Sequence, residues 1–228
     1  MDFVISMPER PSLPVAGSAA RFPVGRIWCV GRNYAEHARE FGHDPEREPP
    51  FFFSKPADAL LSDGRTMPYP PQTGDLHFEA ELVAALGSGG RDISRETALD
   101  HVWGYGAGID FTRRDLQTVA KKLGRPWDLA KGFDCSAACG TLSPVSAAGH
   151  PERGRIALFV DGALRQDGDL SAMIWSVAEV ISALSASVAL KPGDLIYTGT
   201  PAGVGMVERG QTVRVDIEGL ESLVAPIV

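Results

Sequence analysis

The sequence predicts one strand-dominated α+β domain, and three observations favour this fold class. The 25 glycines and 17 prolines among 228 residues are typical of many turns between short strands. Several segments alternate apolar and polar residues or form short apolar runs bounded by turn residues, which is the pattern of β-strands. Helix start and stop signals occur at only a few places. A chain of this length can bury a sizeable core within one domain.

Composition and charge exclude several functional classes. The apolar content of 44% and the charged content of 22% are those of a soluble globular protein. The net charge of −7 argues against nucleic acid or an anionic membrane surface as a partner, because both select basic patches. We expect no signal peptide and no membrane span, since no apolar run is long enough. The three cysteines form neither an even disulfide framework nor a zinc-knuckle spacing, so reduced thiols and a cytoplasmic location are expected.

The first 25 residues differ from the rest of the chain. Residues 1–25 contain four prolines and predict an N-terminal arm, with at most a short strand and an irregular connection. Residues 26–228 contain no internal repeat, no low-complexity tract and no linker, so they are predicted to form a single domain. That domain begins with a compact apolar run over residues 26–31, a predicted strand.

A candidate general base follows this strand. Asn33 can cap a helix that Gly42 ends. On that helix His37 and Glu40 are three residues apart and share a face. A carboxylate beside an imidazole orients the ring and favours its protonated form, as a general base requires. The alternative is an ordinary surface His–Glu pair. The charged, proline-rich residues 44–50 then predict a mobile segment, and three phenylalanines after it predict a buried strand.

The segment 76–86 alternates as a strand does and carries two acids on one face. Glu79 and Glu81 would point away from the core, and like charges this close repel unless a cation lies between them. We therefore infer that both bind a divalent metal; the alternative is an exposed strand whose acids are merely solvated. The opposite face would pack into the core through Leu76, Phe78, Ala80, Leu82 and Ala84.

A second acidic position follows in the next strand. After a helix of about two turns from Ser94, residues 102–111 predict a strand in which glycines permit close backbone approach. The full G-x-G-x-x-G pattern is missing, which argues against a dinucleotide site. Asp110 closes this strand and is well placed to be a third metal ligand, although a turn or N-cap role is the alternative. Thr112 and Asp115 have the spacing of a capping box, so a helix should run to about Leu123.

The C-terminal half predicts two hairpins around a helix and a strand. Residues 127–146 read as irregular, and Lys131 among them is either a surface lysine with a buried stem or a cation directed into a site. The turn signal Asp161-Gly162 predicts a hairpin over residues 156–166. Helical periodicity covers residues 174–190, a strand follows at 194–199, and a second hairpin is expected over 211–228.

Several of these segments together resemble the fumarylacetoacetate hydrolase superfamily over residues 26–228. The order and spacing of six motifs carry the resemblance. The chain resembles the shorter acylpyruvase and fumarylpyruvate hydrolase branch of the superfamily. The charged, proline-rich run over residues 43–50, before the three phenylalanines, is most similar to that of fumarylpyruvate hydrolases. The motifs are Gly31-Arg-Asn-Tyr34 with His37 and Glu40, Lys55-Pro56, Glu79-Ala-Glu81, Asp110, Lys131 and Thr198-Gly-Thr-Pro201.

The resemblance implies a fold of mixed, rolled β-sheets with flanking helices, with residues 26–228 as a single catalytic domain that forms a homodimer. It implies that Glu79, Glu81 and Asp110 hold Mg²⁺ or Mn²⁺, hard cations that suit a set of carboxylate ligands. It further implies that the side chains around the substrate are Lys131, Arg114, Gln117 and Thr200.

The implied activity is that of a metal-dependent hydrolase that cleaves the C–C bond of a 3-acylpyruvate. The favoured substrate is fumarylpyruvate, a dicarbonyl acid of gentisate breakdown in aromatic catabolism, which would yield fumarate and pyruvate. The His37–Glu40 pair would activate water, Lys131 would stabilise the enolate, and the segment after the helix would close as a lid. The alternatives are an oxaloacetate decarboxylase, a keto-acid isomerase of the same superfamily, and a metal-stabilised binding protein without enzymatic activity.

Overall fold

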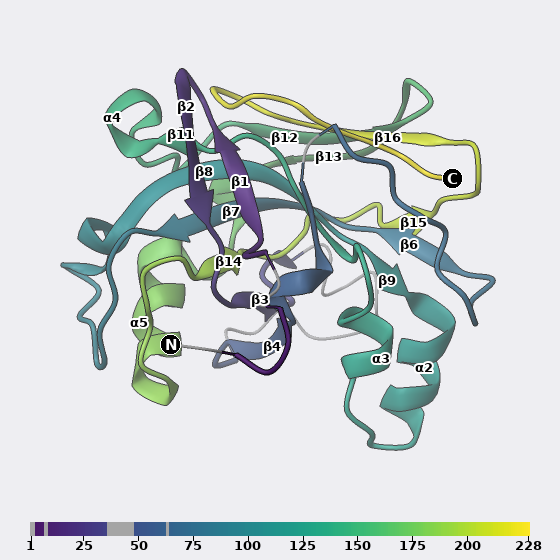
Figure 1. Ribbon diagram of the computed structural model, residues 1–228, viewed down its shortest axis with the longest axis horizontal. Coiled ribbons are helices and arrows are strands. Elements are labelled where there is room, and N and C mark those ends of the chain that lie inside the picture. Colours follow the sequence, from purple (N-terminus) through teal and green to yellow (C-terminus); the bar gives the residue numbers. More distant parts are fainter. Residues whose placement is uncertain (1–2, 7–8, 36–47, 63) are drawn as a thin grey trace.

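A mixed, curled β-sheet forms the centre of the molecule (Figure 1). The computed structural model describes residues 3–6, 9–35, 48–62 and 64–228. Within these residues the central sheet has eight strands in the order β4-β3-β14-β7-β8-β10-β5, with β11 paired to β8. The pairs β3–β14 and β5–β10 are parallel and the other pairs are antiparallel. The strands are β3 (Ile27–Gly31), β4 (Phe51–Lys55), β5 (Leu60–Ser62), β7 (Ala80–Leu86), β8 (Val102–Asp110), β10 (Ala137–Cys139), β11 (Ser143–Pro144) and β14 (Leu195–Tyr197).

Three smaller sheets surround the central one in the described part of the chain. An antiparallel sheet of order β13-β12-β16-β17 shares the main hydrophobic core with β7 and β8. A short sheet of order β15-β6-β9 lies beside the ends of β7 and β8, and β1 pairs with β2. The strands are β1 (Ser12–Val15), β2 (Ser18–Pro23), β6 (Leu76–Phe78), β9 (Thr112–Arg113), β12 (Arg155–Val160), β13 (Ala163–Asp169), β15 (Gly205–Met206), β16 (Thr212–Ile217) and β17 (Leu223–Pro226).

Helices flank these sheets, with α2 and α3 packed against each other and α5 on another side of the molecule (Figure 1). The α-helices are α2 (Arg114–Lys122), α3 (Asp128–Lys131), α4 (Val145–Ala148) and α5 (Val177–Ser187). The 3₁₀ turns are η1 (Ala57–Ala59), η2 (Ala98–His101) and η3 (Leu170–Ala172). No helix in the described ranges is long and apolar enough to cross a membrane. The architecture confirms the predicted fold class, a strand-dominated mixed sheet with few helices.

The predicted strand over residues 76–86 is divided in two, because the chain leaves one sheet at Glu79 and enters another. β6 pairs with β9 and β15, whereas β7 lies between β14 and β8. The prediction of the core-facing side is confirmed: its five residues all belong to the main core. The close approach predicted at the glycines of β8 is also present. A Cβ on Gly108 would lie 2.4 Å from the Val83 side chain, so only glycine fits there.

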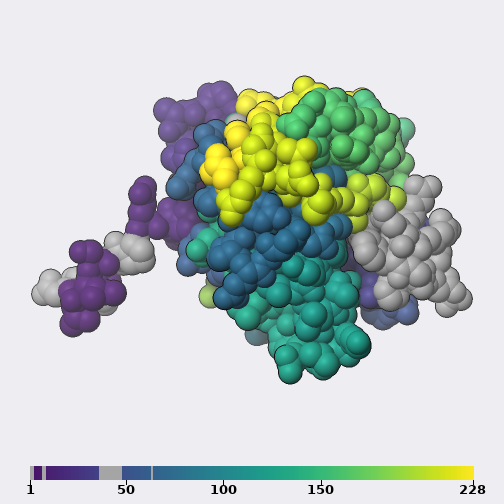
Figure 2. Space-filling model, turned by 90° about the vertical axis from the view of Figure 1, so that its right-hand side faces the viewer, coloured from purple at the N-terminus to yellow at the C-terminus, as the bar shows by residue number. Residues whose placement is uncertain are grey.

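The N-terminal region contains an antiparallel hairpin within the predicted arm. β1 and β2 form this hairpin, and Leu13 and Phe22 are buried in a second core cluster with Leu142 and Tyr197. Residues 3–6 project from the main body of the molecule (Figure 2). Phe3, for example, is 60% exposed.

Other local predictions need correction. The strand at the three phenylalanines is present as β4, but it is not buried: Phe51 is exposed, and Phe52 and Phe53 are half-buried. The helix from Ser94 is replaced by the short turn η2, and the segment 127–146 contains α3, β10, β11 and α4. α2 is present, but Thr112 lies in β9 and provides no cap. The Asp115 carboxylate accepts hydrogen bonds from Thr73 Oγ1 at 2.7 Å and the Gly74 N–H at 3.1 Å, so a tertiary contact uses it.

Candidate active site

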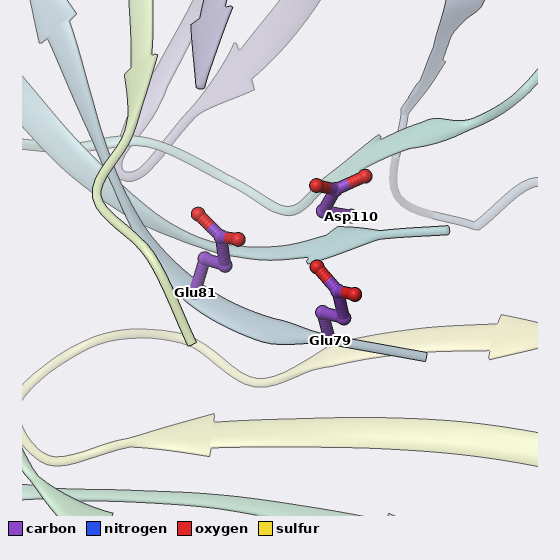
Figure 3. Close-up of side chains that lie close together, drawn as sticks. All are labelled: Glu79, Glu81 and Asp110. Carbon is purple, nitrogen blue, oxygen red and sulfur yellow. The ribbon is translucent and has the colours of Figure 1, made fainter. Parts of the chain in front are cut away.

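Three acidic side chains meet where β7 begins and β8 ends (Figure 3). In the antiparallel register Ala80 lies opposite Ile109, and the Asp110 N–H donates to the Glu79 carbonyl oxygen at 2.9 Å. The strand pairing therefore places Asp110 beside Glu79 and Glu81. One carboxylate oxygen from each of the three acids lies within 4.8 Å of the others.

Burial distinguishes this acidic triad (Glu79, Glu81 and Asp110) from a solvated acidic surface. The three residues are 5%, 1% and 0% exposed, respectively. Carboxylates are rarely buried unless a cation, a proton or several hydrogen bonds compensate for their lost hydration. The alternative of an exposed strand with solvated acids is therefore wrong.

Buried cations contact two members of the triad. Lys131 Nζ lies 2.8 Å from Glu79 Oε2 and 2.6 Å from Asp110 Oδ2. Lys55 Nζ lies 2.7 Å from Asp110 Oδ1, and Arg114 forms a short ion pair with Glu79 Oε1. Burial alone would lower the pKa of the Lys131 ammonium, but Asp110 and Glu79 outweigh this effect and raise its pKa. Lys131 is thus a buried cation directed into the site.

Glu81 has a different environment. Its Oε2 accepts the Gly199 N–H at 2.7 Å. Burial, and then the charges of Asp110 and Glu79, raise the pKa of the Glu81 carboxyl well above its usual range. A divalent cation among the three carboxylates would offset this repulsion. The donors are oxygen atoms of carboxylates alone, which suits a hard ion such as Mg²⁺ or Mn²⁺, so the residues fit such a group.

The predicted substrate residues line the same pocket as two members of the triad. Arg114 and Gln117 stand one turn apart on α2, and Arg114 Nη1 donates to Gln117 Oε1 at 2.6 Å. Thr200 follows β14, and its hydroxyl accepts from Gln166 Nε2 at 2.8 Å. Arg114, Gln117 and Thr200 line one pocket together with Lys131, Glu79 and Glu81. The fold therefore brings together residues that are far apart in the chain.

Two buried residues of the site were missed at the level of sequence. Lys55 belongs to a motif of the resemblance, but its contact with Asp110 could not be read from its own segment. Gln166 is fully buried on β13, where its Oε1 accepts the Ala80 N–H at 2.9 Å. Glutamine in a hairpin strand reads as a solvent-facing residue, so nothing in the local pattern indicated this role.

The predicted general-base pair, His37 and Glu40, lies outside the described residues and stays a prediction. The described start of that segment is anchored by Asn33, which is fully buried. Its Nδ2 donates to the Thr198 carbonyl at 2.7 Å and to the Trp175 carbonyl at 2.8 Å. Its Oδ1 accepts the Trp175 N–H at 2.7 Å. The chain after β3 is thereby fixed to the loop that follows β14.

Comparisons with known proteins agree with this geometry. Residues 26–228 match the family model described as fumarylacetoacetate (FAA) hydrolase C-terminal. A crystal structure of fumarylpyruvate hydrolase from Pseudomonas aeruginosa in complex with Mn²⁺ and pyruvate is 53% identical, with a TM-score of 0.97 over 100% of this chain and 99% of that chain. A fumarylpyruvate hydrolase of Ralstonia sp is 42% identical over 180 residues, 79% of this chain and 93% of that protein.

A second group of relatives is named for a different activity, the tautomerisation of oxaloacetate. The mitochondrial oxaloacetate tautomerase of Homo sapiens is 39% identical over 212 residues, which are 90% of this chain and 96% of that protein. These similarities span most of each protein, and the family model covers the region that contains every residue of the acidic triad and its pocket. The chain therefore belongs to the fumarylacetoacetate hydrolase family.

Proposed function

We propose that this protein is a divalent-metal-dependent hydrolase that cleaves the C–C bond of a 3-acylpyruvate, with fumarylpyruvate as substrate and fumarate and pyruvate as products. The observation that carries the proposal is the buried acidic triad, two of whose members, Glu79 and Glu81, line a pocket with Lys131. Similarity to two fumarylpyruvate hydrolases, one of them a complex with Mn²⁺ and pyruvate, supports the choice of substrate and metal.

The residues divide the reaction between them. A divalent cation held by the triad would supply Lewis-acid stabilisation of the negative charge that develops on the keto acid. Arg114, Gln117 and Thr200 bind and orient the keto-acid end of the substrate. The hydrogen bond between Arg114 and Gln117, the hydrogen bond from Gln166 to Thr200, and burial hold them in place before the substrate binds.

Hydrolysis then needs a base and a stabilised leaving group. The His37–Glu40 pair removes a proton from water, and the water oxygen attacks the acyl carbonyl carbon. The bond from that carbon to the pyruvyl methylene breaks, and its electron pair passes to the pyruvyl fragment as an enolate. The Lys131 ammonium, which its carboxylate neighbours keep protonated, stabilises this charge. A proton added to the methylene carbon completes pyruvate.

A second candidate activity is tautomerisation or decarboxylation of oxaloacetate. The tautomerase of Homo sapiens supports it, and so does an oxaloacetate decarboxylase of Dictyostelium discoideum that is 39% identical over 198 residues. The same triad and Lys131 could stabilise the enolate of oxaloacetate without any attack by water. The two candidates thus differ in the need for attack by water on a carbonyl carbon.

The test is turnover of fumarylpyruvate, acetylpyruvate and oxaloacetate by the purified protein with Mg²⁺, with Mn²⁺ and with a chelator. We expect metal-dependent loss of the dicarbonyl ultraviolet absorbance and equal amounts of fumarate and pyruvate from fumarylpyruvate. Conversion of oxaloacetate without cleavage of either acylpyruvate would contradict the proposal and favour the second candidate.

Assembly and location stay predictions. A homodimer is implied by the resemblance, and a cytoplasmic location by the composition. Analytical ultracentrifugation of the purified protein checks the first, and fractionation of the source cells checks the second.

A further inference from the structure

The pocket extends from the acidic triad to an aromatic side that the proposed chemistry does not use. Phe51, Phe53 and Trp127 line it. The Trp127 ring lies edge-on to both phenylalanines, with centroids 5.8 Å from Phe51 and 5.9 Å from Phe53. We call these three rings the aromatic wall. Such a wall suits a flat, unsaturated carbon chain better than a branched or strongly hydrated one.

The position of the wall depends on a glycine. A Cβ on Gly31 would lie 2.1 Å from the Phe51 ring, so the ring packs directly on the backbone of β3. Phe51 is nevertheless 36% exposed, and an aromatic ring held at a partly open pocket wall is available for contact with a ligand.

Two cations stand at the wall. The Arg32 guanidinium lies 5.4 Å from the Phe51 ring centroid, and Lys121 Nζ lies 5.1 Å from the Trp127 ring centroid. Both residues line the pocket. We call Arg32 and Lys121 the wall cations. They come from different elements, since Arg32 follows β3 and Lys121 lies in the last turn of α2.

Backbone strain marks one of the wall cations. Arg32 has a φ of 57°, in the left-handed region that residues other than glycine rarely adopt. Strain of this kind is found often at functional sites, where the surrounding structure holds it. Here the residue after Arg32 is Asn33, which is buried and hydrogen-bonded to the Thr198 carbonyl, so the fold imposes the conformation at Arg32.

Two cationic side chains, Arg32 and Lys121, line this side of the pocket. Partial burial, followed by the guanidinium groups of Arg114 and Arg32, lowers the pKa of Lys121 to about 8. A carboxylate can pair with a guanidinium and with an ammonium group. The two wall cations thus predict an anionic ligand group at the wall.

We propose that Arg32 and Lys121 bind the second carboxylate of an elongated dicarboxylic keto acid, whose planar chain lies along the aromatic wall. The keto-acid end would lie at the triad and the far carboxylate at the wall cations. This inference rests on the proposed function and deepens it. It assigns the class of substrate to long 2-oxo dicarboxylates, and it separates fumarylpyruvate from acetylpyruvate, which has no second carboxylate.

The test compares two ligands of equal chain length, 2-oxoheptanedioate and 2-oxoheptanoate, which differ only in the far carboxylate. Binding to the Mn²⁺-loaded protein is measured by titration calorimetry, so turnover is not required. We expect the wild type to bind the dicarboxylate about 10-fold more tightly, as charge-assisted hydrogen bonds to one anionic group allow.

The variants Lys121→Met and Arg32→Met should each weaken binding of the dicarboxylate and leave binding of the monocarboxylate within about 2-fold. Lys121→Arg keeps the charge and should preserve the preference. Lys122→Met is the matched control, because Lys122 is exposed on the same helix and does not line the pocket. Thermal unfolding verifies that each variant is folded. If Arg32→Met does not fold, the binding of both ligands to Lys121→Met is sufficient to test the proposal.

Equal affinity of the wild type for the two ligands would overturn this inference, and so would an equal loss of both in Lys121→Met. Failure of the proposed function has a different signature. If fumarylpyruvate is not cleaved but the dicarboxylate is still preferred, the wall cations retain their assignment and only the reaction is wrong.

Discussion

Glu81 and Glu79 are both buried ligand candidates, yet their surroundings predict opposite effects of removing their charge. Glu79 contacts Lys131 and Arg114, whereas the hydrogen bond to Glu81 comes from the Gly199 backbone N–H. A buried charge that loses its partner is costly, but a buried charge that repels its neighbours is costly while present. The two neighbouring glutamates are therefore a matched pair for experiment.

We expect Glu81→Gln to weaken Mn²⁺ binding by more than about 10-fold while the metal-free protein keeps or gains stability. Glu79→Gln should also weaken Mn²⁺ binding, but it leaves the buried Lys131 and Arg114 short of negative charge and should cost about 3–5 kcal/mol of unfolding free energy. Calorimetric titration with Mn²⁺ and urea unfolding in chelator measure the two effects. Equal loss of stability in both variants would contradict the assigned charge balance.

Lys131 is predicted to act on the reaction rather than on metal binding. Its ammonium contacts the carboxylates of two members of the triad. A divalent cation would bind oxygens of the same carboxylates, so the two positive charges compete. Lys131→Met should therefore leave Mn²⁺ affinity unchanged or higher, while kcat falls by roughly 10²-fold or more because a charge near the enolate is lost. Steady-state kinetics and Mn²⁺ titration of the same sample separate the two. Loss of Mn²⁺ binding would make Lys131 a structural support for the site.

Among the individual residues of the site, the triad could be predicted from the sequence, because two acids side by side on one face of a strand repel each other unless a cation lies between them. It could not predict Lys55 or Gln166 as their partners. Lys55 reaches Asp110 across the sheet, and Gln166 reaches Ala80 from another sheet. Such contacts depend on tertiary packing, and no local pattern contains them.

Among the elements, β3 and β4 build the aromatic side of the pocket through one close contact. Gly31→Ala would place a methyl group on the Phe51 ring, so the ring must move. We expect about 1–2 kcal/mol lower stability and a roughly 10-fold lower kcat/KM for fumarylpyruvate, since the wall is displaced. Kinetics and urea unfolding measure both.

Gly74→Ala is the control for this prediction, because nothing lies within 4 Å of a Cβ there. The double variant Gly31→Ala with Phe51→Ala should recover most of the lost stability, since the clash is gone. If Gly31→Ala behaves as Gly74→Ala does, the Phe51 ring is not held where the structure places it.

Elements with strong local signals were predicted well. The Asp161-Gly162 hairpin is present as β12 and β13, with φ values of 50° and 82° at the turn, and the helix in the segment 174–190 is present as α5. The capping box predicted at Thr112 failed because Asp115 bonds Thr73 and Gly74 instead. A box is in fact present at α5, where Ser176 and Glu179 cap each other. Local motifs hold where no tertiary contact competes for the same side chain.

For the whole molecule, the triad predicts that metal binding stabilises the fold. A ligand at 100 times its Kd adds about 2.7 kcal/mol to the unfolding free energy, if it binds only the folded state. For a protein of this size we expect Tm to rise by roughly 5–10 °C. Thermal unfolding with Mn²⁺ and with chelator measures the shift, and Glu81→Gln should at least halve it at the same Mn²⁺ concentration. A Tm independent of Mn²⁺ would show that the buried acids have another role.

The arrangement of the sheets was the part least accessible from composition and periodicity alone. The central sheet pairs β3 with β14 and β5 with β10, strands that are far apart in the chain. Because register and order arise from such non-local pairings, hydrophobic pattern can indicate the strands but not their neighbours. The resemblance to a known family supplied the mixed sheet that local patterns left open.

The anchoring of Asn33 has a consequence for the reach of the pocket. Asn33 follows Arg32 directly, its amide holds the Thr198 carbonyl, and a Cβ on Gly199 would lie 2.6 Å from the Asn33 Cβ. Gly199 in turn donates its N–H to Glu81. A single amide side chain therefore fixes the distance between Arg32 at the aromatic wall and Glu81 in the triad. We expect the pocket to select its ligands by length for this reason.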